Sequence, residues 1–207
     1  ERVKVEQNTQ KFSFKELISE IAHNKALIGI IVCALLFLLA QLSLSNMNNY
    51  IYPNYFGNVS AMSLANLAGM VVILVLSTFI VKLSAKVGKK ELSVIGSIIS
   101  AAAFLILFFI HTDNVWVWIV LVLISSVGTA MFNMVIWAMI TDVIDDSEVR
   151  TGVRQDGTIY SVYSFARKLG QACSSGLAGV LLSIVGYTTA TAFDPKVIDG
   201  IYNVTCL

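Results

Sequence analysis

The chain has 207 residues, of which 57% are hydrophobic and only 13% are charged, with a formal net charge of +1. Soluble domains carry about 25% charged residues, so this composition excludes an ordinary soluble enzyme or binding domain. The small net charge gives no reason to expect nucleic acid as a partner.

The charged residues are bunched between long apolar stretches. Residues 26–81, 92–112 and 114–141 contain no Lys, Arg, Asp or Glu. A helix needs about 20 apolar residues to cross the hydrocarbon core of a bilayer. The sequence therefore predicts an all-α polytopic membrane protein, with the lipid bilayer as its first partner.

Residues 1–25 are polar, but apolar residues recur in them at helical spacing, which predicts a short amphipathic helix on the membrane surface. Five membrane spans are expected to follow, at residues 26–52, 61–81, 92–110, 115–140 and 157–187. The first should stop at Pro53, because proline lacks the N–H that a helix needs. Loops are expected at residues 82–91 and 141–156, and a short turn at residues 111–114. An apolar stretch that starts at residue 198 is expected to begin a sixth span.

The basic residues predict an orientation. Five Lys or Arg lie in residues 1–25, four in residues 82–90 and two in residues 141–156, whereas the loops on the other side hold only Lys196. By the positive-inside rule, the N-terminal segment is expected to be cytoplasmic.

Lys168 lies in the middle of the fifth predicted span. A charge near the bilayer midplane costs roughly 3 kcal/mol on insertion scales. Tyr160, Ser164, Gln171 and Ser175 share its face of the helix, because they are spaced at steps of three and four residues. This stripe predicts contact with a substrate, an ion or a buried partner. The alternative is that Lys168 extends along the helix to the membrane surface.

Arg167 points about 100° away from Lys168 and is interpreted as a cation that extends to the surface or to the rim of a cavity. No Asp or Glu lies within any predicted span, and Asp142 and Asp145 lie at the cytoplasmic mouth, too shallow to pair with Lys168. The counter-ion of Lys168 is therefore expected from outside this chain, or from a bound anion or sugar.

Two other predicted spans carry polar side chains. Gln41, Ser45, Asn48 and Tyr52 share one face of the first span, and Asn133 lies on a polar edge of the fourth. Such side chains either line a wet cavity or hydrogen-bond to neighbouring helices, and the sequence leaves both interpretations open.

The chain shows no sign of catalytic or metal chemistry. Cys33, Cys173 and Cys206 have neither metal-ligand spacing nor a disulfide pattern. An intramembrane enzyme would need a nucleophile and a base at depth, but His23 and His111 both lie at the membrane edges. No catalytic residue, resident metal or cofactor is therefore expected.

The loop before the fifth span and the first half of that span carry a recognisable motif. Residues 141–157 read TDVIDDSEVRTGVRQDG, and residues 160–170 read YSVYSFARKLG. These segments resemble the glycoside–pentoside–hexuronide:cation symporters, the melibiose-permease-like branch of the major facilitator superfamily. The matching positions are Asp142, Asp145, Glu148, Gly152, Arg154 and residues 168–170. Residues 49–58, NYIYPNYFGN, look like the end of that family's seventh helix.

The resemblance implies that the chain forms helices seven to eleven of a twelve-helix transporter in a bacterial inner membrane. Residues 1–25 would connect two six-helix bundles, and residues 26–207 would be the C-terminal bundle, truncated before its last helix. The N-terminal six-helix bundle would be the partner that supplies the acidic residues for a coupling Na⁺ or H⁺. The substrate would be a sugar or glycoside.

In that family, the lysine at the position of Lys168 lies in the sugar and cation-coupling region. Under the resulting hypothesis of symport by alternating access, the residues for substrate binding or coupling are Lys168, Tyr163, Ser164, Asn133, Gln41, Asn48 and Gln171. A cytoplasmic gate would comprise Asp142, Asp145, Glu148, Arg150 and Arg154, with a merely solvated loop as the alternative. Five spans cannot form a two-bundle transporter alone, so the alternative function is a non-transporting accessory or packing subunit.

Overall fold

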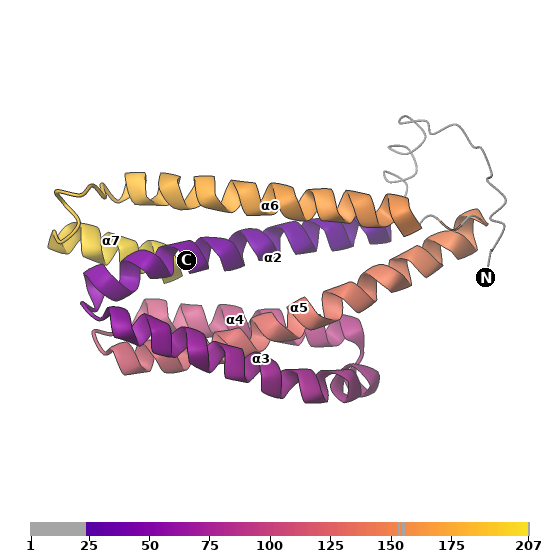
Figure 1. Cartoon of the computed structure of the whole chain (residues 1–207), viewed down its shortest axis with the longest axis horizontal. Coiled ribbons are helices and arrows are strands. Elements are labelled where there is room, and N and C mark those ends of the chain that lie inside the picture. The colour runs from indigo at the N-terminus through magenta and orange to yellow at the C-terminus, as the bar shows by residue number, and fades with distance from the viewer. Residues whose placement is uncertain (1–23, 153, 155, 207) are drawn as a thin grey trace, which may run out of the picture.

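The computed structural model describes residues 24–152, 154 and 156–206, and they form helices with short connections (Figure 1). In chain order these are α2 (Lys25–Tyr50), the π-helical turn η1 (Ile51–Tyr55), α3 (Val59–Val87), α4 (Lys89–Ile110), α5 (Val115–Thr151), α6 (Asp156–Ile184) and α7 (Pro195–Cys206). No strand occurs in these described ranges, so the predicted all-α class is confirmed. The surface helix predicted within residues 1–25 lies outside the described residues.

Three helices begin at an asparagine. Asn24, Asn58 and Asn114 each accept, on the side-chain oxygen, a hydrogen bond of 3.0, 3.1 and 2.9 Å from a backbone N–H of the first helical turn. The first N–H groups of a helix have no partner within the helix, so each cap satisfies one of them. These caps fix where α2, α3 and α5 begin.

The first helix continues through Pro53 and ends at Tyr55, which corrects the predicted stop. Residues 51–55 form a wider π-helical turn, in which the Phe56 N–H donates to the Ile51 oxygen, five residues earlier, at 3.1 Å. In this turn the hydrogen bonds skip one residue more than in an α-helix, so the missing N–H of proline does not end the helix.

The loop predicted at residues 82–91 is wrong, because α3 and α4 are joined by Gly88 alone. Gly88 has a φ of 105°, a conformation that residues with a Cβ rarely adopt. Lys82 and Lys86 lie on exposed helical turns of α3. Charge ends the part of a helix that lies in hydrocarbon, but lysine is a good helix former and does not end the helix.

Charged residues also continue α5, which runs through most of the loop predicted at residues 141–156. The helix ends at Gly152, which has a φ of 71° and donates its N–H to the Glu148 oxygen at 2.8 Å. The connection to α6 therefore shrinks to residues 152–155. The short turn predicted at residues 111–114 is confirmed between α4 and α5.

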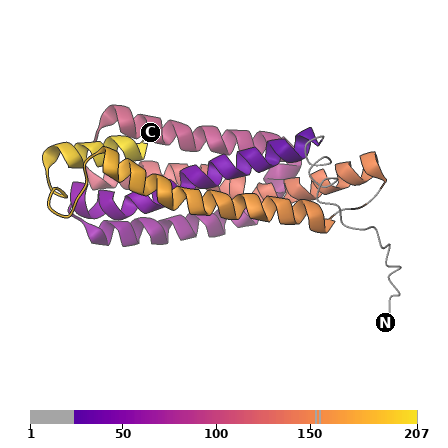
Figure 2. The same cartoon turned by 90° about the horizontal axis from the view of Figure 1, so that it is seen from above.

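The helices form two groups (Figure 1), and in the view from above α2 and α6 lie in front of the other group (Figure 2). In one group α6 packs along α2, and in the other α5 packs along both α3 and α4. The chain runs back and forth, so that the α3–α4 connection and the start of α6 lie at one end, whereas the α2–α3 connection, the α4–α5 turn and α7 lie at the other (Figure 1). Alternate connections at opposite ends are what a chain that repeatedly crosses a membrane requires.

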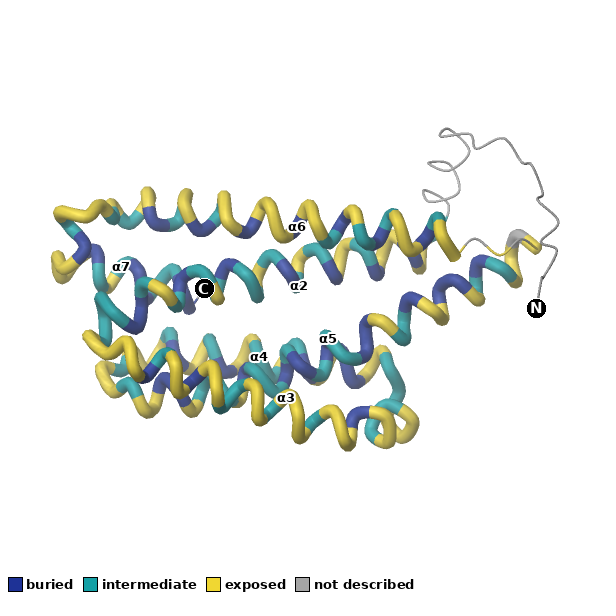
Figure 3. Tube along the Cα trace, in the orientation of Figure 1, coloured by how far each residue is buried: buried dark blue, intermediate teal, exposed yellow. Residues whose placement is uncertain are grey.

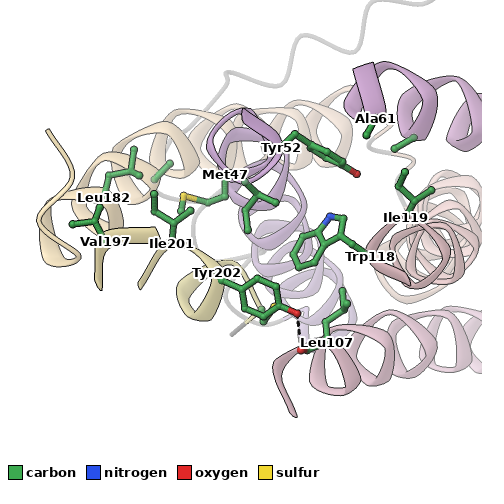
Figure 4. Packing of buried hydrophobic residues seen from close by; sticks show 14 residues of the cluster. Met47, Tyr52, Ala61, Leu107, Trp118, Ile119, Leu182, Val197, Ile201 and Tyr202 are labelled. Atoms are coloured by element: carbon green, nitrogen blue, oxygen red, sulfur yellow. Dashed lines mark hydrogen bonds between the residues drawn. The ribbon is translucent and has the colours of Figure 1, made fainter. Parts of the chain in front are cut away.

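The end that carries α7 holds the largest apolar cluster (Figure 4). Met47 of α2, Trp118 of α5 and Ile201 of α7 are each at most 1% exposed there. The Tyr202 hydroxyl donates to the Leu107 oxygen at 2.9 Å and accepts from the Thr112 N–H at 3.2 Å. The stretch predicted to start a sixth span thus lies in a 12-residue helix that is docked against η1, α2 and α4.

Four helical segments are long and apolar enough to cross a membrane: Lys25–Tyr55, Val59–Val87, Lys89–Ile110 and Val115–Arg150. Many of their apolar side chains are exposed, above all on α3, where Leu67 and Leu74 are 62% and 67% exposed (Figure 3). The predicted polytopic membrane protein is therefore supported by the structure. α6 has 29 residues, as α3 does, but it is not one of the four, because its polar stripe makes it less apolar. Its crossing of the membrane stays a prediction.

α4 and α5 approach each other through two glycines. A Cβ added to Gly96 would lie 2.6 Å from the Gly128 carbonyl oxygen, and a Cβ added to Gly128 would clash with the Gly96 carbonyl oxygen. Beside this contact, the Ser100 hydroxyl donates to the Ser125 oxygen at 2.8 Å. Small residues at such a contact let helix backbones approach closely within a membrane.

Replacing Gly128 with alanine should destabilise the protein, because the added methyl group meets the backbone of α4, which cannot move aside as a flexible side chain would. The expected cost is about 1–3 kcal/mol, as for other overpacked interiors. Thermal unfolding of the purified protein in detergent measures this as a lower melting temperature. Gly69→Ala is the matched control, since nothing lies within 4 Å of its added methyl. Equal melting temperatures for the two variants would contradict the close α4–α5 contact.

Candidate functional site

The residues of α6 separate into a packed side and an open side. The buried strip, which faces α2, comprises Ile159, Tyr163, Ala166, Gly170, Ser174, Ala178 and Leu182. Lys168, Gln171 and Ser175 are exposed, and Ser164 is partly buried. Successive residues of a helix are about 100° apart, so Lys168 lies roughly 160° around α6 from Gly170. The packing of α6 on α2 therefore turns the predicted polar stripe to the open side.

Lys168 makes no hydrogen bond or ion pair with any residue in the part of the chain that the structure describes. It lies 12 residues after the start of α6 at Asp156, which is about 18 Å along the helix axis. If α6 crosses the membrane, this depth is close to the middle of a hydrocarbon core about 30 Å thick. The ammonium group is thus free to meet water, an anion or a carboxylate from beyond this chain.

Arg167 lies in an aromatic cluster between α5 and α6. Its guanidinium carbon is 4.7 Å from the centroid of the Trp137 ring and 5.8 Å from that of Tyr163. The Trp137 ring in turn lies 5.8 Å from the Tyr160 ring and 5.6 Å from the Tyr163 ring. We call these four residues the Arg167 cluster. Arg167 is partly buried within it, and this cation–π contact was not among the interpretations that the sequence offered.

Gln41 and Asn133 meet across the two helix groups. The Asn133 side-chain nitrogen donates to the Gln41 side-chain oxygen at 3.1 Å, which connects α5 to α2. Beside them, the Phe37 and Phe132 rings stack with centroids 3.9 Å apart. Of the two interpretations left open, the interhelical hydrogen bond is therefore realised for this pair. Both side chains are only partly buried, so they can still contact a ligand.

Two further predicted site residues lie in different surroundings. Asn48 is partly buried, and its side-chain oxygen is enclosed without a hydrogen-bond partner among the described residues. Buried acceptors in proteins are normally paired, so this oxygen is a place for a water or ligand donor. Tyr163, a member of the Arg167 cluster, is only 1% exposed and lies on the packed side of α6. Its role as a substrate ligand stays a prediction.

Charged residues gather where α5 ends and α6 begins. Arg154 binds three carboxylates, those of Glu148 at 2.7 Å, Asp156 at 2.9 Å and Asp145 at 3.2 Å. The hydrogen bonds to Asp156 and Glu148 raise the pKa of Arg154 above its ordinary value, so the guanidinium stays charged. This arrangement joins the last turns of α5 to the first turn of α6 and brings together three of the five predicted gate residues.

The other two predicted gate residues pair elsewhere. Asp142 binds Lys89, the first residue of α4, at 2.6 Å, and Arg150 binds Asp146, one turn earlier on α5, at 2.9 Å. The sequence analysis missed Lys89 and Asp146. The four-residue spacing of Asp146 and Arg150 could have indicated their pairing. No local signal indicated the Lys89–Asp142 pair, because it depends on how α4 packs on α5.

Comparison of the sequence with known proteins identifies the family of this chain. Residues 1–207 match the family described as MFS/sugar transport protein. The chain is 31% identical over 192 residues to the uncharacterized symporter YjmB of Bacillus subtilis (strain 168), which is 93% of this chain and 42% of YjmB. It is 28% identical over 210 residues to the uncharacterized symporter YnaJ of the same organism, which is all of this chain and 45% of YnaJ.

A third relative is the glucuronide carrier protein homolog of Escherichia coli (strain K12), which is 34% identical over 117 residues, 56% of this chain and 26% of that protein. The chain thus spans less than half of the length of each of these relatives. With its exposed apolar helices and its match over all 207 residues, the chain belongs to the MFS/sugar transport protein family, a family of membrane transporters and not of enzymes.

Proposed function

We propose that this chain is part of a secondary transporter that carries a sugar or glycoside together with Na⁺ or H⁺ by alternating access. Helices α2 to α6 would be helices seven to eleven of twelve, and the N-terminal six-helix bundle would be the partner that completes the binding site. The names of the relatives, two symporters and a glucuronide carrier, support transport of this kind. The transporter would lie in a bacterial inner membrane with the start of α2 at the cytoplasmic side.

The observation that carries the proposal is the exposed, unpaired ammonium of Lys168 on a polar face of α6. A cation at this depth is costly in hydrocarbon and is normally kept for a substrate or ion pathway. Gln171 and Ser164 lie on the same open side and offer hydrogen-bond donors and acceptors for sugar hydroxyls. The surface that covers this side in the complete protein would supply the carboxylates for the coupling cation.

α6 would cross the membrane as the fifth span. It lies beside α2, an apolar helix long enough to cross, and the two share a continuous packed interface. Polar residues on a spanning helix are tolerated where they face a bundle interior or a water-filled cavity. The polar stripe of α6 therefore supports a spanning helix that borders an aqueous cavity.

The charged residues around Arg154 would act as the cytoplasmic gate. They join α5 to α6 at the same end of the molecule as the Gly88 connection, which carries the basic residues that indicate the cytoplasmic side. Exposed ion pairs contribute little to stability, and such pairs can exchange partners as two bundles rock.

Replacing Lys168 with alanine in the complete transporter should lower cation-driven sugar uptake by about tenfold or more, the equivalent of about 1.4 kcal/mol. Uptake of a panel of radiolabelled glycosides into vesicles, at equal protein amounts, measures the effect. Lys196→Ala is the matched control, because this exposed lysine lies at the start of α7, away from the stripe. Unchanged uptake by Lys168→Ala would remove the role assigned to the ammonium. Absence of uptake by the unaltered complete protein would favour the non-transporting accessory subunit.

Gln41→Ala and Asn133→Ala should each lower thermal stability, and their effects should not add. The expected coupling is about 0.6 kcal/mol, the average for hydrogen bonds between membrane helices. Unfolding of the two single variants and the double variant measures it, and sugar binding to the same three proteins tests the substrate role. Additive stability losses together with weakened sugar binding would mean that the pair serves the substrate and not the α2–α5 contact.

Arg154→Gln should loosen the end of α5, because three carboxylates lose their shared cation and repel one another. Hydrogen–deuterium exchange of the last turns of α5 and the first turn of α6 should become faster, and sugar uptake should fall. Lys90→Gln is the control, since this exposed lysine lies in the first turn of α4 and outside the proposed gate. Faster exchange with normal uptake would identify the charges as a solvated helix end and not as a gate.

A further inference from the structure

Arg167 and Lys168 lie on the two edges of the polar stripe of α6. Adjacent residues of a helix are about 100° apart, and the positions of Ser164 and Gln171 fall between the two cations around the helix. A sugar that binds Ser164 and Gln171 would thus lie between a guanidinium and an ammonium. The ligand side of this helix carries two positive charges.

The carboxylates at the end of α5 pair with Lys89, Arg150 and Arg154, and not with Arg167 or Lys168. Residues 26–81, 92–112 and 114–141 contain no Asp or Glu, and Asp156, which begins α6, is bound to Arg154. In the proposed function, carboxylates from the N-terminal bundle serve the coupling cation beside Lys168. The proposed function assigns no role to Arg167.

The Arg167 cluster holds this guanidinium in place. Its carbon stacks 4.7 Å from the centroid of Trp137 and is also near the ring of Tyr163. Stacking on aromatic rings uses the faces of the planar group and leaves N–H donors at its edges for further hydrogen bonds. Arg167 forms no ion pair with a carboxylate of the residues that the structure describes. A guanidinium has five N–H donors, so a hydrogen bond to Tyr163 leaves others for a carboxylate, which a fixed guanidinium can bind through two parallel hydrogen bonds.

We propose that Arg167, held by Trp137, is the specificity-determining residue that recognises a carboxylate on the transported sugar. This inference rests on the proposed function, and it narrows the substrate class to sugars or glycosides that carry an acid group. Trp137 acts as a positioning residue, because its ring holds the guanidinium.

The test compares two probes that differ only at one carbon of the sugar, p-nitrophenyl β-D-glucuronide and p-nitrophenyl β-D-glucoside. The complete transporter and its Arg167→Gln and Arg167→Lys variants are assayed for binding by calorimetry and for cation-driven uptake in proteoliposomes. The unaltered protein should bind the glucuronide at least about tenfold more tightly than the glucoside. Arg167→Gln should lose that preference with little change in glucoside binding. Arg167→Lys should recover only part of it, because lysine keeps the charge but not the two parallel donors.

Each outcome bears on the inference. Equal binding of the two probes by the unaltered protein, or failure to bind the glucuronide, overturns it. An equal loss of binding for both probes in Arg167→Gln also overturns it and assigns the cluster to the α5–α6 contact alone. Glucoside uptake without glucuronide binding leaves the proposed function standing while the inference fails. Glucuronide binding that depends on Arg167, without cation-driven uptake of either probe, supports the inference while the proposed function fails.

Discussion

The contact between α6 and α2 determines where the polar side chains of α6 lie. Buried residues recur along α6 at steps of three and four residues and along α2 at steps of three to five, and the two helices are in contact at Gly170, where an added Cβ would lie 3.5 Å from the Leu35 carbonyl oxygen. A helix packed along one strip cannot rotate without exposing that strip. The rotation of α6 is therefore fixed, and with it the placement of Lys168 on the open side. Gly170 lies two residues after Lys168, so its contact with α2 holds Lys168 on the opposite side of α6.

The two helix groups are held together unequally. Within the second group, α4 and α5 touch backbone to backbone at Gly96 and Gly128, a contact with no room to slide. Between the groups, α5 meets α2 and α6 through side chains alone: a buried apolar cluster that includes Ile30, Ile136 and Ile159, a hydrogen bond, a ring stack and the Arg167 cluster. Side-chain contacts of this kind can shorten, lengthen or exchange partners at modest cost. In a protein that must alternate between two states, movement would concentrate at such contacts while the glycine contact stays rigid.

The sequence predicted the helices, the polar stripe of α6 and the turn between α4 and α5, but it missed several other helix ends and the contacts between helices. Long uncharged stretches indicate which part of a helix lies in hydrocarbon, but they do not indicate where the helix ends. The helices continue in water through charged residues, as at Lys82, Lys86 and the end of α5. Pro53 was expected to end a helix, but a π-helical turn accommodates it. Tyr163 lies five residues from Lys168, or roughly 140° around the helix, so spacing alone could have placed it on the packed side. The contact of Arg167 with Trp137 joins two helices, and no pattern within either helix could reveal it.

Charged residues are paired where α5 meets α6 and unpaired with carboxylates at the position of Lys168 along α6. Where α5 meets α6, Arg154, Arg150 and Lys89 all pair with carboxylates of the same chain. Deeper along α6, Arg167 and Lys168 have no carboxylate partner among the described residues. Unpaired charges are cheap in water and expensive in hydrocarbon, so a chain optimised only for stability would show the opposite distribution. The pairs at the end complete the helix connections within the chain, whereas the two deep cations remain available to groups that arrive from outside it. This distribution supports the proposal that a ligand binds at the open side of α6.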